Sequence, residues 1–363
     1  MTRRDLNCVH EPFGDAFYYG PERLSARFEN NEKGRTDSGF SKTTYKHVLN
    51  KIDEENEEGK RIFIKDIAYY LFPPEGKPAS IAPSLARIEK GVGTNGVNGT
   101  PNGIKSINAE TTPYPSKPHS ELNNPTVLPA EFLKKFHFTF LIRNPRSSIP
   151  SYYRCTQPPL DKVTGFYEFM PNEAGYEELH RLFDYLRSTG QVGPKLASSK
   201  ETSGVNGNHH QNGVKDDSGL EICLIDADDL LDNPNGIIEA YCNSIGYKYD
   251  PGMLSWDTEE DDQIARALFA KWPGFHDDAF QSSALKPRHH VSSLPETNPC
   301  CRYSTNGVVG DFKRSSSDHD DDAQWRQRFG EKAARVIRET VDANMEHYEY
   351  LKQFALKAAI TST

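Results

Sequence analysis

Three short apolar runs limit the folds that this chain can adopt. They are RIFIKDIAYYL at 61–71, FTFLIR at 138–143 and EICLIDADDLL at 221–231. FTFLIR and the ICLI of the third run are short, continuous apolar stretches without alternation, which is typical of strands buried on both faces of a parallel sheet. The first run is expected to turn helical after its strand.

Helical patterns occur between and after these runs. Apolar positions at helical spacing predict helices over 172–190 and roughly 325–355. A further helix is predicted over 233–246, with Asn233 as its N-cap and Gly246 at its end. Strands that alternate with helices predict an α/β fold with a mainly parallel sheet flanked by helices.

Two stretches lack apolar periodicity and are predicted to be disordered insertions. Residues 91–124 and 188–219 are rich in Gly, Asn, Ser and Pro, a composition that buries too little apolar surface to fold. The glycines of the first stretch are not followed by Gly-Lys-Ser/Thr, so they do not indicate a phosphate loop. The ordered remainder is expected to form a single domain spanning 1–363.

Charge and hydropathy argue against several classes of protein. The net charge is −9, which is unfavourable for a general nucleic-acid-binding protein. No apolar run approaches the roughly 20 residues that cross a bilayer, and no secretion signal follows the basic N-terminus. The six cysteines include no C-x-x-C pair, which favours a reduced, cytoplasmic protein. We expect neither a nucleic-acid nor a membrane partner, and the oligomeric state stays open.

The stretch FTFLIRNPRSSIPSYYR at 138–154 predicts a strand, a turn and a helix in succession. Ser148 is expected to cap the helix, with Pro150 in its first turn. Arg143 then leaves the strand tip toward Ser151, near the positive end of the helix. A guanidinium, a hydroxyl and free N–H groups form an anion site suited to phosphate or sulfate. The alternative is that the arginines form surface ion pairs and the serines only cap.

This turn resembles the 3′-phosphate motif of sulfotransferases that use PAPS (3′-phosphoadenosine 5′-phosphosulfate). The matching residues are R-N-P-R at 143–146 and Ser151, eight residues after Arg143. The resemblance implies that Arg143 and Ser151 hold the 3′-phosphate of the cofactor PAPS. Overall, the chain is similar to sulfotransferase-like, P-loop-related proteins of filamentous fungi, many of which belong to secondary-metabolite pathways. The implied reaction is sulfuryl transfer to a hydroxyl of a small organic acceptor.

A second segment, NGVVGDFK at 306–313, resembles the late glycine-rich segment of the same family. That segment normally begins Arg-Lys-Gly and ends Gly-Asp-Trp-Lys. Gly307 and Lys313 match it and are cofactor-binding candidates. The usual Arg-Lys pair is replaced by Thr-Asn at 305–306, and Arg302 is near enough in the chain to substitute for it.

The family's loop for the 5′-phosphosulfate, of the type Pro-Arg-Ser-Gly-Ser/Thr-Thr, has no counterpart in this sequence. In relatives, a segment like HEPFGDAFYYGPER, here at 10–23, follows the helix after that loop, so Met1 is expected near the end of that helix. Two explanations compete. Either the natural protein has roughly 20 to 40 more residues, or the chain is a truncated paralogue with impaired cofactor binding.

Sulfuryl transfer needs a base for the acceptor's proton and cations that stabilise the leaving phosphate. The family's Lys-Thr-His segment, with its catalytic histidine, is replaced here by Lys65-Asp66-Ile67. Distant relatives use a carboxylate just after the first helix, and Glu11 matches that place as general base. Lys65 is a candidate contact to the phosphosulfate, and Asp66 is a weaker base candidate. Alternatively, Glu11 caps a turn or pairs with Arg23, and Lys65 is an ordinary strand-end lysine.

Other polar and aromatic groups give weaker signals. His209-His210 and His289-His290 lack cysteine or carboxylate partners at ligand spacing, so no metal site is predicted. Trp256, Trp272 and Phe275 are candidates to line an acceptor pocket, although core packing is the commoner role of such residues.

Three functions are therefore weighed. The first is a PAPS-dependent sulfotransferase. The second is a non-catalytic binding or accessory protein on a sulfotransferase fold, favoured by the absent loop and the absent histidine. The third, a nucleotide kinase or NTPase, ranks last because a Walker lysine is lacking and only Asp226 and Asp228 are candidates to bind magnesium.

Overall fold

The computed structural model describes residues 3–55, 59–86, 120–197, 220–277, 282–285 and 318–358. The chain divides into two compact units. Unit 1 comprises Met1–His10, Asn56–Lys65 and His137–Thr363, and unit 2 comprises Glu11–Glu55 and Asp66–Phe136. The expectation of one domain over 1–363 stays a prediction.

The described strands of unit 1 pair in parallel, as predicted, but they form three separate two-stranded sheets instead of one sheet. The pairs are β1 (Leu6–His10) with β2 (Arg61–Lys65), β3 (Phe140–Ile142) with β6 (Leu224–Asp226), and β4 (Val192–Leu196) with β5 (Leu220–Ile222). Leu224 also forms a parallel bridge with Ala355. Parallel strands interspersed with helices are consistent with the α/β class.

Helices of unit 1 follow these strands. They are α5 (Pro145–Cys155), α6 (Asp161–Thr164), α7 (Tyr176–Ser188), α8 (Ala227–Asp232), α9 (Pro234–Ser244), α10 (Glu259–Phe269), α12 (Asp318–Phe329) and α13 (Glu331–Lys352), with 3₁₀ turns at Pro171–Glu173 and Pro251–Leu254. The predicted helix over 233–246 is confirmed as α9, because the side chain of Asn233 accepts the N–H of Gly236 and Gly246 has a positive φ of 67°.

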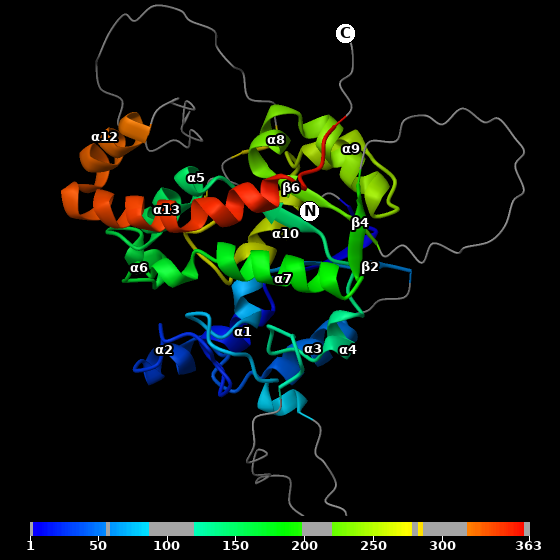
Figure 1. Ribbon diagram of the computed structural model, residues 1–363, viewed down its shortest axis with the longest axis horizontal. Helices are drawn as coiled ribbons and strands as arrows, with labels where there is room; N and C mark the ends of the chain where they lie inside the picture. Colours follow the sequence, from blue (N-terminus) through cyan, green and yellow to red (C-terminus); the bar gives the residue numbers. More distant parts are fainter. Residues whose placement is uncertain are drawn as a thin grey trace, which may run out of the picture. The chain divides into compact units, whose positions relative to one another are not determined.

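The C-terminal helix α13 packs with α5, α7 and α12 in one part of the core of unit 1 (Figure 1). Ile337 and Val341 on α13 pack with Ile149 on α5 and Trp325 on α12, and all four are almost completely buried. The predicted single helix over 325–355 is wrong at one point. Gly330, with φ 85° and ψ 166°, separates α12 from α13, because that conformation is accessible to glycine and strained for other residues.

The start of α5 differs from the prediction. Asn144, not Ser148, is the N-cap, since its side chain accepts the N–H of Arg146 at 3.0 Å. Pro145 occupies the first helical position, where a missing N–H costs nothing, and Pro150 lies inside the helix rather than in its first turn. Ser151 consequently stands on the second turn of α5.

The predicted disordered insertions are wrong at their edges. Residues 188–197 include the end of α7 and all of β4. At the other insertion, Asn124 is buried and its amide donates to the carbonyl of Leu128 at 2.7 Å. The central parts of both stretches, 91–119 and 198–219, lie outside the described residues.

Unit 2 is built from short helices around an aromatic core. Its helices are α1 (Phe13–Tyr18), α2 (Glu32–Asp37), α3 (Tyr45–Glu54) and α4 (Ala130–Leu133), with 3₁₀ turns at Ala68–Leu71 and Pro83–Leu85. Tyr18, Tyr45 and Phe72 are almost completely buried. The buried carboxylate of Glu22 accepts the N–H of Tyr45 at 3.0 Å and the hydroxyl of Ser84 at 2.8 Å, so its charge is compensated by hydrogen bonds.

Two other sequence predictions concern membranes and thiols. In the part of the chain that the structure describes, no helix has both the length and the apolarity to cross a membrane. Cys8, Cys155, Cys223 and Cys242 are free thiols, and Cys300 and Cys301 lie outside the described residues.

Candidate functional site

The carboxyl ends of β3 and β6 lie side by side, because Ile142 pairs with Asp226. Arg143 directly follows β3 and its side chain is exposed. Among the described residues, no carboxylate forms an ion pair with this guanidinium. The second arginine of the motif is engaged, since Arg146 pairs with Asp321 on α12 at 3.2 Å. Of the two arginines, only Arg143 is therefore available to an anionic ligand.

Tyr176, the first residue of α7, holds the turn after β3. Its hydroxyl donates to the carbonyl oxygen of Arg143 at 2.5 Å and lies 2.5 Å from Oγ of Ser148. Because the phenol has one proton, Ser148 is the donor in the second bond. Burial raises the pKa of Tyr176 to about 12, although the bond from Ser148 and the charge of Arg143 act to lower it. The guanidinium charge therefore acts on this cluster.

Ser151 is half-buried on the second turn of α5. The structure joins Arg143 to Ser148 through Tyr176, and the convergence of Arg143 with Ser151 stays a prediction. Tyr152, the residue after Ser151, donates its hydroxyl to the carboxylate of Glu173 at 2.8 Å.

Asp226 is completely buried at the end of β6. One carboxylate oxygen accepts the N–H of Asp228 at 2.7 Å and caps α8. The other accepts the hydroxyl of Tyr348 at 2.7 Å and lies 3.3 Å from Nζ of Lys352. This set of partners gives Asp226 a structural role, which weakens the case for magnesium-dependent phosphoryl transfer at this strand.

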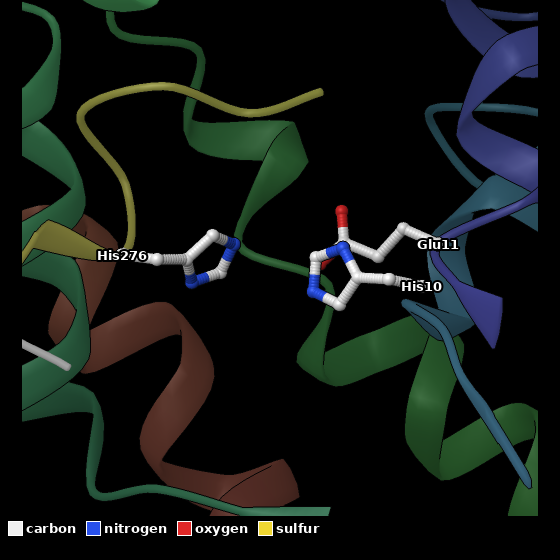
Figure 2. A group of neighbouring side chains, drawn as sticks. All are labelled: His10, Glu11 and His276. Atoms are coloured by element: carbon white, nitrogen blue, oxygen red, sulfur yellow. The ribbon is translucent and has the colours of Figure 1, made fainter. Parts of the chain in front are cut away.

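The end of β1 carries a second group of ionisable residues in unit 1. His10 pairs in register with Lys65 at the end of β2, and Lys65 is half-exposed. The rings of His10 and His276 lie close together and almost perpendicular (Figure 2), with centroids 5.0 Å apart and an interplanar angle of 83°. Phe269 on α10 packs 4.5 Å from each ring. Sequence patterns missed this pair because His10 and His276 are brought together only by the fold.

Glu11, the predicted general base, belongs to unit 2 and is 3% exposed. Its φ of 48° is unusual for a residue with a side chain. The carboxylate accepts the hydroxyl of Tyr70 at 3.1 Å, and the pKa of Tyr70 is raised chiefly by burial and further by neighbours that include Glu11. A buried carboxylate on strained backbone is typical of functional sites.

Asp66, the weaker base candidate, lies in the same unit as Glu11. One carboxylate oxygen of Asp66 accepts the N–H of Phe13 at 3.0 Å. The other accepts the N–H of Ile67, the next residue in the chain, at 2.8 Å. These bonds hold the first residue of α1 and the start of the following 3₁₀ turn. Asp66 therefore organises backbone, which supports Glu11 over Asp66 as the candidate base.

The remaining predicted residues divide into two groups. Arg302, Gly307 and Lys313 lie outside the described residues. Trp272 is buried in the core, and Trp256 is half-buried with its indole N–H donated to the carbonyl of Ser282 at 2.7 Å.

The site also contains residues that sequence reasoning missed. Tyr176 was assigned to the apolar stripe of the predicted helix over 172–190. That assignment predicts packing of its ring and gives its hydroxyl no role. Tyr348 was likewise assigned to the apolar face of the predicted helix over 325–355. Lys352 was not assigned to any predicted face or site. Their roles depend on contacts with Arg143 and Asp226, which no sequence spacing reveals.

Comparisons with known proteins give one consistent class. The chain is 28% identical over 246 residues to "Sulfotransferase ppzF" of Metarhizium rileyi (strain RCEF 4871), a match that covers 66% of this chain and 58% of that protein. It is 26% identical over 245 residues to "Sulfotransferase ppzF" of Metarhizium majus (strain ARSEF 297), with the same coverage. The chain thus spans less than two thirds of these curated relatives. No family model and no solved structure matches the chain. The two similarities support a sulfotransferase-like function.

Proposed function

We propose that this protein is a PAPS-dependent sulfotransferase that transfers a sulfuryl group to a hydroxyl of a small organic acceptor. The observation that carries the proposal is the exposed Arg143 at the carboxyl end of β3, where no carboxylate among the described residues neutralises it. Ligands of open α/β sheets bind at this edge, and an arginine fork suits a phosphate dianion. Similarity to two proteins named sulfotransferases agrees with this.

Each candidate residue has a defined role in the proposed reaction. Arg143 and Ser151 hold the 3′-phosphate of the cofactor, and Tyr176 fixes the turn that carries them. Bound PAPS supplies the activated sulfuryl group. Glu11 takes the proton of the acceptor hydroxyl as the acceptor's oxygen–sulfur bond forms. The leaving phosphate would keep the electron pair of its bond to sulfur and so gain negative charge. Lys65 stabilises that charge.

The resemblance to fungal sulfotransferase-like proteins extends the proposal to a role in secondary metabolism. The acceptor would then be a phenol or alcohol made by the same pathway. A cytoplasmic location is part of this proposal.

Calorimetric titration with PAP, the desulfated product, tests the cofactor site. We expect the protein to bind PAP and the Arg143→Ala variant to bind it about 10-fold more weakly or worse, since charged hydrogen bonds contribute about 1.5–3 kcal/mol. Adenosine 5′-monophosphate lacks the 3′-phosphate, so its affinity should not change in this variant. Arg266→Ala on α10, which removes an exposed guanidinium paired with Asp262, is the matched control.

Two results would contradict the proposal. One is a wild-type protein that does not bind PAP, which would favour the non-catalytic function. The other is an Arg143→Ala variant that loses affinity for adenosine 5′-monophosphate and PAP equally, because Arg143 would then not read the 3′-phosphate.

A further inference from the structure

Two histidines from different helices of unit 1 meet at a place to which no role in sulfuryl transfer has been assigned. His180 on α7 and His347 on α13 place their Nδ1 atoms 2.9 Å apart. Both side chains are half-buried, so solvent ions reach them. The two helices pack along each other in the core of unit 1.

The ring of His180 is oriented by two neighbours. Oδ2 of Asp184, one turn further along α7, lies 3.3 Å from Nε2 of His180. The ring of Tyr350 stacks on the imidazole at 4.0 Å between centroids, and its hydroxyl donates to Oδ1 of Asp184 at 2.6 Å. A carboxylate on Nε2 selects the tautomer with its proton on that nitrogen, so the lone pair of Nδ1 faces His347. Metal-binding histidines are oriented in this way.

We propose that His180 and His347 bind a divalent transition-metal cation such as Zn²⁺ or Ni²⁺ through their Nδ1 atoms. Binding moves the proton of His347 from Nδ1 to Nε2, so the neutral pair releases no net proton. Tetrahedral coordination with bonds of about 2.0–2.1 Å separates the two nitrogens by roughly 3.3 Å. From the present separation of 2.9 Å, with ring centroids 5.2 Å apart, the two nitrogens open by a few tenths of an ångström. Both rings also turn so that their lone pairs point at the cation instead of at each other, and water completes the coordination.

Charges around the pair favour a cation. Burial lowers the pKa of His180, His347 lowers it further, and Asp184 and Glu346 oppose this effect. Neutral imidazole is the form that binds metals. The two carboxylates add negative charge close to the nitrogens. The guanidinium of Arg187 lies 3.8 Å from Asp184 and donates to the hydroxyl of Tyr350.

Thermal unfolding of the full chain in the presence of Ni²⁺, Zn²⁺ or Mg²⁺ tests the site. Cys300→Ser and Cys301→Ser are introduced first, because adjacent thiols bind the same metals. A cation that binds the folded state raises Tm by mass action, and we expect a rise of at least about 2 °C with saturating Ni²⁺ or Zn²⁺. Mg²⁺ should have no effect, since it prefers oxygen ligands.

Two single variants separate this site from the other histidine pair. His347→Gln should abolish the rise in Tm, and calorimetry should show the loss of one bound Ni²⁺ per chain. His276→Gln, which breaks the pair with His10, should leave both unchanged. The proposal is overturned if wild type shows no rise, if His347→Gln keeps it, or if only His276→Gln loses it. The first two results would leave a hydrogen-bonded histidine pair that only joins α7 to α13.

Discussion

The hydroxyl of Tyr348 on α13 donates a hydrogen bond of 2.7 Å to Oδ2 of Asp226, the last residue of β6. Both residues have no exposed surface. The bond joins the C-terminal helix to the strand whose parallel partner leads into Arg143. The position of the proposed phosphate-binding turn therefore depends on a buried polar contact between segments that are far apart in the chain.

Replacing Tyr348 with Phe should destabilise the protein by about 1–3 kcal/mol, because a buried carboxylate loses one of its donors. The ring is kept, so core packing changes little. Chemical denaturation followed by circular dichroism measures the effect. Tyr167→Phe is the control, since Tyr167 is 68% exposed and should change stability by less than about 0.5 kcal/mol. Equal stability of both variants would show that the bond to Asp226 contributes nothing.

Sequence patterns predicted several strands and helices of unit 1. They misplaced an element where two residues were equally suited to the same position, or where the residues of a strand were unfavourable for strands. The continuous apolar run FTFLIR identified β3 because burial on both faces leaves no alternation. The start of α5 was placed too late, because Asn144 and Ser148 are both good capping residues and only the observed bond to Arg146 decides between them. β4 was missed because its Gly and Pro are unfavourable in strands.

In the candidate site, too, the sequence suggested some residues and missed others. Arg143 was proposed from its place after a strand and from a resemblance in sequence, Glu11 was proposed from the resemblance, and the roles of both stay predictions. Tyr176 and Tyr348 were assigned to apolar faces, because a helical stripe does not distinguish a tyrosine that only packs from one that also donates a hydrogen bond. Such partners follow from tertiary contacts and have no signature in residue spacing.

Tyr176→Phe should weaken PAP binding several-fold while the protein stays folded. The variant removes the donor to the carbonyl of Arg143 and the acceptor for Ser148, so the turn after β3 loses two bonds that fix it. Calorimetry with PAP gives the affinity, and thermal unfolding checks the fold. Tyr152→Phe, which removes the bond to Glu173 on the same side of α5, is the control. An unchanged PAP affinity in Tyr176→Phe would separate this tyrosine from the cofactor site.

Gly330→Ala should destabilise the protein by about 1–3 kcal/mol, since the backbone at φ 85° and ψ 166° is strained for any residue with a Cβ. A Cβ at this position meets no atom within 4 Å, so the cost is conformational rather than steric. Chemical denaturation measures it, and Glu339→Ala on the exposed face of α13 is the control. Unchanged stability would mean that α12 and α13 tolerate another conformation at their junction.

Glu178→Gln should make the protein more stable at pH 7 and leave its stability unchanged at pH 4. Burial raises the pKa of Glu178 on α7 above its ordinary value of 4.5, so the folded state holds its proton more tightly than the unfolded state. Its favourable contribution is fully present below pH 4.5 and is lost as pH rises through the folded pKa. Denaturation at several pH values checks this, with the exposed neighbour Glu177→Gln as control. A pH-independent difference would contradict the mechanism.

Glu11→Gln tests the general base of the proposed sulfotransferase. Glutamine keeps the size of the buried side chain and an oxygen that can accept the hydroxyl of Tyr70, but it cannot take a proton from the acceptor. We expect sulfuryl transfer from PAPS to a panel of phenols to fall by about 10²–10⁴-fold with unchanged PAP affinity.

The matched control for this variant is Asp66→Asn. Because Asp66 accepts backbone N–H groups of Phe13 and Ile67, its loss should lower Tm more than the rate per folded molecule. Glu11→Gln should do the opposite, since the removal of a buried charge costs the fold little when an isosteric amide replaces it. If the rate of Glu11→Gln stays within about threefold of wild type, Glu11 is not the base, and its strained φ of 48° must serve the packing of Tyr70 instead.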